Sequence, residues 1–167
     1  IYDRRMVDGL RALGESVEVT ELPGRHPAPD EAAEAGARAA LHALPADARI
    51  VIDGLGLPAF LPLAQELSAR RAVALIHHPT ALEHGFAEAT RMVLKSKERA
   101  LFGACARLVC TSPLTARRLP EEFGADADRI GVVEPGTDPA QRAAGSGGPG
   151  CAILSVGTLV PRKGHDV

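Results

Sequence analysis

The chain has 167 residues, enough for one domain and part of another, and a hydrophobic content of 46% is sufficient for a sizeable core. A net charge of −2 and an aromatic content of 3% without tryptophan argue against a basic nucleic-acid surface and a base-stacking platform. Three cysteines without a CxxC pair argue against a disulfide framework and a structural zinc site, so we expect a reducing cytoplasm.

Short apolar runs alternate with helical stretches along the chain. The pattern first predicts a helix over 2–13 that ends at Gly14, a strand over 17–22, and a helix over 30–42 capped by Asp30. It then predicts buried strands at 49–53, 72–76, 108–111 and 130–133, which alternate with helices at 58–70, 87–103 and 113–122. We therefore predict an α/β fold with a Rossmann-like, doubly wound parallel sheet of at least five strands, covered by helices on both faces.

A small, polar, glycine-rich stretch over residues 139–150 interrupts this alternation and is typical of an interdomain linker. A new buried strand is expected over 151–156. We therefore divide the chain into a first domain over 1–140, a linker over 141–150 and the start of a second domain over 151–167. Because the chain begins with isoleucine and stops within a pattern, we expect both ends to be truncated.

Ligands of an open parallel sheet bind beyond the carboxyl ends of the strands, so the polar residues after each strand are the candidates for a site. His77 and His78 directly follow the strand at 72–76, and Pro79 then forces the chain into a turn. Glu83 is near enough in sequence to join them. A simple hydrogen-bonded histidine pair explains this pattern equally well, and the spacing matches no metal-binding motif.

The run VGTLVPRKGHD over 156–166 places Arg162 and Lys163 in a loop before a helix that opens near Gly164. Two cations beside a helix N-terminus suit a phosphate, although two solvated surface cations would give the same pattern. The run is not a P-loop. The GLG at 54–56 lacks the remainder of a dinucleotide fingerprint, and no nucleophile elbow is present.

Four segments together resemble glycosyltransferase family 4, whose members are retaining enzymes of the GT-B fold that use nucleotide sugars. They are LIHHPTALE, LVCTSPLTARRL, RIGVVEPGTDPA and ILSVGTLVPRKGHDV, in that order. The resemblance implies two Rossmann-like domains that face each other across a cleft, the first binding the acceptor and the second the sugar nucleotide. It also implies that the first strand of the family precedes or coincides with Ile1.

The resemblance also implies a reaction and its residues. A hexose would pass from a nucleoside diphosphate sugar to an acceptor, with His77 as the catalytic histidine beside the sugar and Arg162 and Lys163 binding the donor diphosphate. Further candidates to line the cleft are His78, Glu83, Ser112, Gly136, Gly157 and Thr158. No metal or other cofactor and no nucleic-acid partner are expected. The expected location is cytoplasmic, with room for peripheral contact at the inner face of a membrane.

Two departures from the family pattern bear on these expectations. Many members have an arginine, a second diphosphate ligand, where this chain has Thr158, and the paired glutamates of the C-terminal domain would lie beyond Val167. The chain alone is therefore expected to be inactive. Two alternatives stay open: a sugar-nucleotide epimerase of the same architecture, and a non-catalytic α/β binding module.

Overall fold

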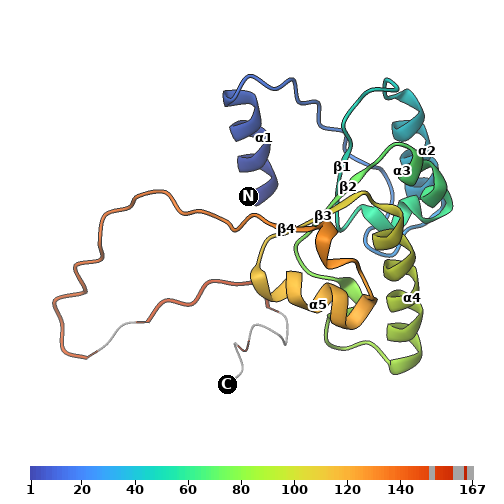
Figure 1. The fold of residues 1–167 in the computed structure, drawn as a ribbon. Coiled ribbons are helices and arrows are strands. Elements are labelled where there is room, and N and C mark those ends of the chain that lie inside the picture. Colours follow the sequence, from blue (N-terminus) through green and yellow to red (C-terminus); the bar gives the residue numbers. More distant parts are fainter. Residues whose placement is uncertain (151–152, 160–163, 165–167) are drawn as a thin grey trace. The chain divides into compact units, whose positions relative to one another are not determined.

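The computed structural model describes residues 1–150, 153–159 and 164 (Figure 1). The chain divides into two units, Ile1–Pro135 and Gly136–Val167. The first unit carries the regular secondary structure of the described residues. Its α-helices are α1 (Tyr2–Ala12), α2 (Glu31–Ala43), α3 (Ala64–Ala69), α4 (Glu88–Ala104) and α5 (Pro113–Phe123). Its strands are β1 (Val51–Asp53), β2 (Val73–Ile76), β3 (Arg107–Cys110) and β4 (Ile130–Val132), and its 3-10 turns are η1 (Leu57–Leu63), η2 (Thr80–Leu82) and η3 (Ala127–Arg129).

The four strands form one parallel sheet in the order β1-β2-β3-β4 (Figure 1). The register places Ile52 beside Ala74, Ala74 beside Leu108 and Leu108 beside Ile130. The first three of these side chains are at most 6% exposed, so this face of the sheet forms the core. The prediction of a Rossmann-like α/β fold is confirmed.

The expected cover on both faces of the sheet is incomplete in the described residues. On the second face Val51 is 62% exposed and Arg107 is also exposed, whereas Val73 and Val109 are half-buried. The reason lies in the strand order. Helices α3, α4 and α5 each connect neighbouring strands in the same direction, and right-handed crossovers place all such connections on one face.

Local sequence signals account for the limits of several helices. Asp30 accepts a hydrogen bond from Ala33 N–H at 3.0 Å and thereby caps α2, as predicted. Gly124 ends α5 with a φ of 66°. The helix predicted over 58–70 is instead a 3-10 turn followed by α3, because Pro62 has no N–H to continue an α-helical ladder.

The strand predicted over 17–22 is wrong. This segment forms no strand, although it alternates apolar and polar residues. A pocket of about 470 Å³ is lined by this segment on one side and by β1, α2 and η1 on the other. The segment therefore does not pair with β1, and the sheet has four strands in the described residues rather than the five expected.

The second unit is exposed over residues 136–150 and 153–159. The strand predicted over 151–156 is absent from its described part, residues 153–156, where Ile153, Leu154 and Val156 are 87–88% exposed. A single segment without a neighbouring strand has no partner for its backbone hydrogen bonds. The division of the chain into 1–140, 141–150 and 151–167 stays a prediction.

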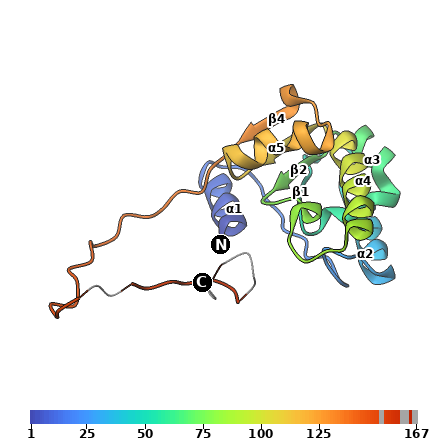
Figure 2. The same cartoon turned by 90° about the horizontal axis from the view of Figure 1, so that it is seen from below.

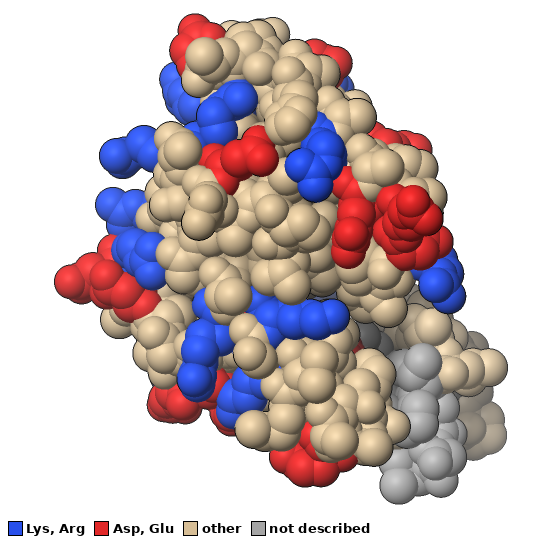
Figure 3. Space-filling view, turned by 90° about the vertical axis from the view of Figure 1, so that its right-hand side faces the viewer, with Lys and Arg blue, Asp and Glu red and all other residues tan. Residues whose placement is uncertain are grey.

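Helices α2, α3 and α4 lie together on one side of the first unit in both ribbon views (Figures 1 and 2). Seen from the direction of Figure 3, acidic and basic side chains are interspersed, without a large area of a single sign. This distribution agrees with the small net charge of the chain and does not suggest an electrostatic docking surface on that face.

Candidate functional site

The carboxyl ends of β1 and β2 bring Asp53 and His77 together. His77 directly follows β2, and Asp53 is the last residue of β1. Because parallel strands end at the same edge of a sheet, these two side chains project from neighbouring positions. His77 Nε2 lies 3.3 Å from Asp53 Oδ2, while Asp53 Oδ1 accepts the Leu55 N–H at 2.8 Å. The second contact fixes the orientation of the Asp53 carboxylate.

The first turn of α1 adds a second carboxylate to the same histidine. Asp3 Oδ1 lies 2.9 Å from His77 Nε2. The side chains of His77, Asp53 and Asp3 are 36%, 38% and 53% exposed, so the group is partly open to solvent. We call Asp3, Asp53 and His77 the histidine cluster.

Tyr2 fixes the same turn of α1 against the sheet. Its ring meets the His77 ring edge-on, with the centroids 5.3 Å apart, and its hydroxyl donates a hydrogen bond to Val133 O at 2.7 Å. Partial burial, followed by the nearby Asp3 carboxylate, raises the pKa of Tyr2, so the phenol keeps its proton at neutral pH. Tyr2 therefore ties α1 to the end of β4 as well as to His77.

The geometry assigns different roles to the two ring nitrogens of His77. When the neutral ring carries its proton on Nε2, which faces both carboxylates, Nδ1 has a lone pair and can accept a hydrogen bond. The cluster also offers three ligand atoms within 4.8 Å of one another, a spacing that a metal ion could use. Each carboxylate already lies within hydrogen-bond or ion-pair distance of His77 Nε2, so the geometry has an explanation without a metal.

Ser112 lies at the same edge of the sheet but serves a structural purpose. Its Oγ accepts the Thr115 N–H at 3.1 Å and donates to Thr115 Oγ1 at 3.0 Å, which caps α5. Thr115 Oγ1 in turn donates to the backbone carbonyl of His77 at 3.4 Å. Ser112 is thus connected to the histidine turn through Thr115, although its hydroxyl is engaged in the cap.

The other predicted residues are not members of the histidine cluster as far as the structure describes them. His78 is exposed and is not part of the histidine cluster, and Glu83 is half-buried. Gly136, Gly157 and Thr158 belong to the second unit and are exposed. Arg162 and Lys163 lie outside the described residues, so their predicted roles in binding a diphosphate stay predictions.

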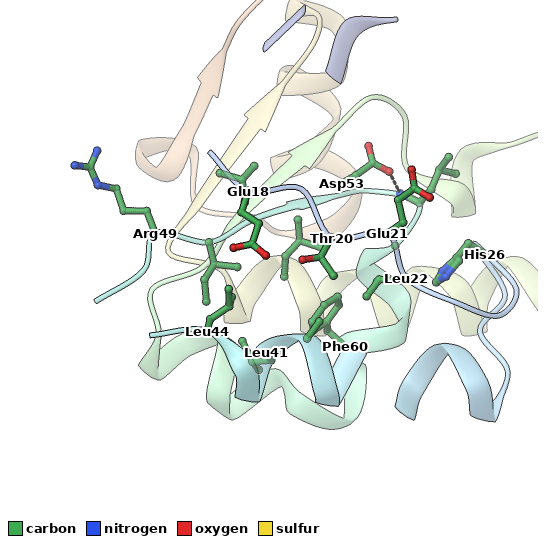
Figure 4. A pocket seen from close by; sticks show the side chains of 16 residues that line it. Glu18, Thr20, Glu21, Leu22, His26, Leu41, Leu44, Arg49, Asp53 and Phe60 are labelled. Atoms are coloured by element: carbon green, nitrogen blue, oxygen red, sulfur yellow. Dashed lines mark hydrogen bonds between the residues drawn. The ribbon is translucent and has the colours of Figure 1, made fainter. Parts of the chain in front are cut away.

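The large pocket described above does not open onto His77. Figure 4 shows Leu41, Leu44 and Phe60 on one side of it and the side chains of Glu18 and Thr20 on the other. Asp53 is the member of the histidine cluster that also lines this pocket. The pocket occupies the free edge of β1, and we do not assign it as the substrate site.

Sequence reasoning selected His77 but missed the partners that hold it. Asp53 carried a usable signal, because it is the last residue of a predicted strand, at the edge where polar residues were sought. Tyr2 and Asp3 carried none, since Asp3 precedes His77 by 74 residues and is an ordinary first-turn acid of a helix. Their role depends on where α1 packs, which local sequence does not specify.

The chain has a Rossmann-like parallel α/β sheet with a polar cluster at its carboxyl edge, the edge at which open parallel sheets generally bind ligands. The sequence profile of Glycosyltransferase Family 4 matches residues 22–141, which is more than half of the chain. The chain therefore belongs to Glycosyltransferase Family 4, a family of glycosyl-transferring enzymes.

One curated relative matches a shorter stretch. It is a D-inositol 3-phosphate glycosyltransferase of Acidothermus cellulolyticus, 38% identical over 80 residues, a match that covers 42% of this chain and 18% of the relative. The matched stretch is thus a small part of that protein. No solved structure gives a significant match to the chain. Among the described residues, no helix combines the length and apolar character needed to cross a membrane.

Proposed function

We propose that this chain supplies the acceptor-side domain of a retaining GT-B glycosyltransferase that transfers a hexose from a nucleoside diphosphate sugar. Membership of the family and the name of the curated relative support the general reaction. The observation that carries the proposal for this chain is His77, which lies at the carboxyl edge of the sheet with one nitrogen held by two aspartates.

In this proposal His77 orients the transferred sugar. The carboxylates of Asp3 and Asp53 hold Nε2, which leaves Nδ1 to accept a hydrogen bond from a sugar hydroxyl. An oriented sugar meets the acceptor in a near-attack geometry, which lowers the entropic part of the barrier. The aspartates would act through the ring and would not themselves contact the sugar.

The diphosphate leaving group would be stabilised by the second domain. Negative charge grows on the diphosphate as the glycosidic bond breaks, and Arg162 and Lys163 are the cations proposed to meet it. Gly157 and Thr158 precede them in the sequence. Because Thr158 replaces a common arginine of the family, Arg162 is proposed to supply the second positive charge. His78, Glu83 and Gly136 remain candidates to line the cleft.

The acceptor is the least specified part of the reaction. The relative is named for D-inositol 3-phosphate, so that compound is the acceptor with which an assay should begin. A cytoplasmic location, peripheral contact with a membrane and activity without a metal cofactor are part of the same proposal. Addition and chelation of divalent ions in the assay test the last point.

The test is His77→Ala in an enzyme that joins this chain to a complete C-terminal domain. We expect turnover to fall about tenfold or more, which corresponds to loss of one hydrogen bond at the transition state. The fold should persist, because the ring is partly exposed. His78→Ala is the matched control and should have a smaller effect. Normal transfer by the His77 variant would remove that residue from the proposed site.

A further inference from the structure

The turn that carries His77 is fixed at both ends. Ile76, which ends β2, accepts a backbone hydrogen bond from Thr111 N–H at 3.3 Å. Beyond the two histidines, Pro79 is fully buried and η2 begins at Thr80. His77 and His78 are therefore the short connection between a central strand and a buried turn.

A buried carboxylate from another helix holds the far end of this turn. Glu98 of α4 is 7% exposed. Its Oε1 accepts the Thr80 N–H at 2.6 Å, and its Oε2 accepts the Ala81 N–H at 3.0 Å. These are the first backbone donors of η2, whose N-cap is Pro79 and provides no side-chain cap. Glu98 thus supplies the capping oxygens from a position 18 residues away from Thr80.

Burial of the Glu98 carboxylate carries a desolvation cost. Burial raises the pKa of Glu98, and its hydrogen bonds to Ala81 and Thr80 offset only part of that effect. An uncharged side chain at this position would avoid the desolvation cost. It would, however, leave at least one of two N–H groups without an acceptor, the part-buried one of Thr80 or the buried one of Ala81. Glu98 therefore fixes the turn at Thr80 and Ala81 at the expense of a desolvation cost that an apolar residue of α4 would not have.

We propose that Glu98 is a positioning residue for His77, which it keeps at the carboxyl edge of the sheet by clamping the backbone of Thr80 and Ala81. The inference rests on the proposed function for the role of His77, whereas the clamp itself is a property of the fold. Glu98 does not contact the His77 ring. It acts through the backbone that follows the two histidines.

The clamp is tested on the chain itself by residue-resolved amide hydrogen exchange. In Glu98→Gln the side-chain oxygen can accept one N–H, and the amide nitrogen cannot accept the other. We expect exchange at Thr80 or Ala81 to rise about tenfold or more, while Leu108 and Val109 in the centre of the sheet are unaffected. Glu98→Asp keeps the charge but shortens the reach, and should change exchange in the same direction.

Glu88→Gln is the matched control, because Glu88 is an exposed glutamate of the same helix and pairs with Arg91. It should leave the exchange at Thr80 and Ala81 unchanged. Unchanged exchange at both amides in the two Glu98 variants would overturn the clamp. An equal rise at all amides would also overturn it, since Glu98 would then merely stabilise the fold.

The link to His77 is tested separately by a double-mutant cycle in an enzyme with a complete C-terminal domain. Glu98→Gln should lower kcat, and combining it with His77→Ala should lower kcat little further, because both changes remove the same interaction. Additive effects would overturn the positioning role. If His77→Ala alone has no effect, the proposed function of His77 fails while the exchange experiment still judges the clamp.

Discussion

At the scale of single residues, the site depends on charges held in fixed places. His77 is fixed by two carboxylates at one nitrogen, and its turn is fixed by Glu98. In the proposed diphosphate site, by contrast, cationic side chains bind the negative charge of a substrate that enters and leaves. Substitutions in the first unit should therefore change the position of His77, whereas substitutions in the second should weaken binding of the diphosphate.

Lys163→Ala tests the proposed diphosphate contact in an enzyme with a complete C-terminal domain. A charge-assisted hydrogen bond is worth roughly 1.5–3 kcal/mol, and each 1.4 kcal/mol corresponds to about a factor of ten. We expect nucleoside diphosphate binding, measured by calorimetry, to weaken by about ten- to a hundredfold. Turnover should fall further, because charge grows on the leaving group. Unchanged affinity together with unchanged turnover would refute the donor-site assignment.

The raised pKa of Glu98 predicts how its contribution to stability depends on pH. The folded state binds this proton more readily than the unfolded state, so the contribution of Glu98 is full below the ordinary glutamate pKa. It is lost as the pH rises through the raised value in the folded protein. Relative to Glu98→Gln, which does not titrate, the wild type should lose stability over that interval.

Urea unfolding between about pH 4 and pH 7 measures this difference. Glu88→Gln serves as the control, because its side chain is exposed. A difference in free energy of unfolding between wild type and Glu98→Gln that is independent of pH would contradict the raised pKa of Glu98.

At the scale of elements, tight backbone turns determine where the helices begin. Gly24 has a φ of 83°, and a Cβ at this position would collide with Asp30 Oδ1 and with the backbone of Ala33. These are the two groups that form the cap of α2. A side chain at position 24 would therefore disturb the start of the helix as well as strain the backbone.

Gly24→Ala should accordingly destabilise the fold more than Gly14→Ala does. Gly14 has a similar φ of 89°, but nothing lies within 4 Å of its hypothetical Cβ. The Gly14 variant should lose about 1–2 kcal/mol in free energy of unfolding, which is the effect of a left-handed conformation alone. Urea unfolding of both variants gives the loss in free energy of unfolding for each, and the difference between them is the steric contribution at position 24. Equal losses would argue against the collision.

The helices and buried strands of the first unit could be predicted well from the sequence, because their apolar periodicity reflects the face that they bury. The helix at 88–104 and the strands at 73–76 and 107–110 lie within one or two residues of the prediction. The segment at 17–22 shows the limit of this reasoning. Its alternation is that of a strand, but a strand also needs a neighbour, and pairing across the chain is not encoded locally.

The candidate site was predictable to a similar extent. His77 follows a predicted buried strand and lies two residues before Pro79, so its place at the sheet edge could be foreseen. Asp3 and Glu98 could not, because each acts across a packing contact that local patterns do not reveal. Glu98 occurs in a helix with many charges, and its burial depends on how α4 lies against η2.

At the scale of the whole molecule, the chain combines a packed unit with a segment that buries little. The hydrophobic core joins residues of α2, η1, β2, α4 and α5 within Ile1–Pro135. Residues 136–150 are exposed and have no helix or strand. This contrast predicts where the chain can be divided without disturbing the sheet.

Limited proteolysis with trypsin tests that division. Arg142 is exposed and lies in a stretch without regular secondary structure, so its peptide bond can enter a protease site without unfolding of a helix. Arg99 and Arg107 lie in α4 and β3, where cleavage requires local unfolding of the core.

We expect an early cut after Arg142, detected by mass spectrometry, and retention of the circular dichroism spectrum of the first unit. Arg142→Gln should abolish that fragment and leave the other cuts as they are. Early cleavage after Arg99 or Arg107, with Arg142 protected, would show that the chain is not divided in this way.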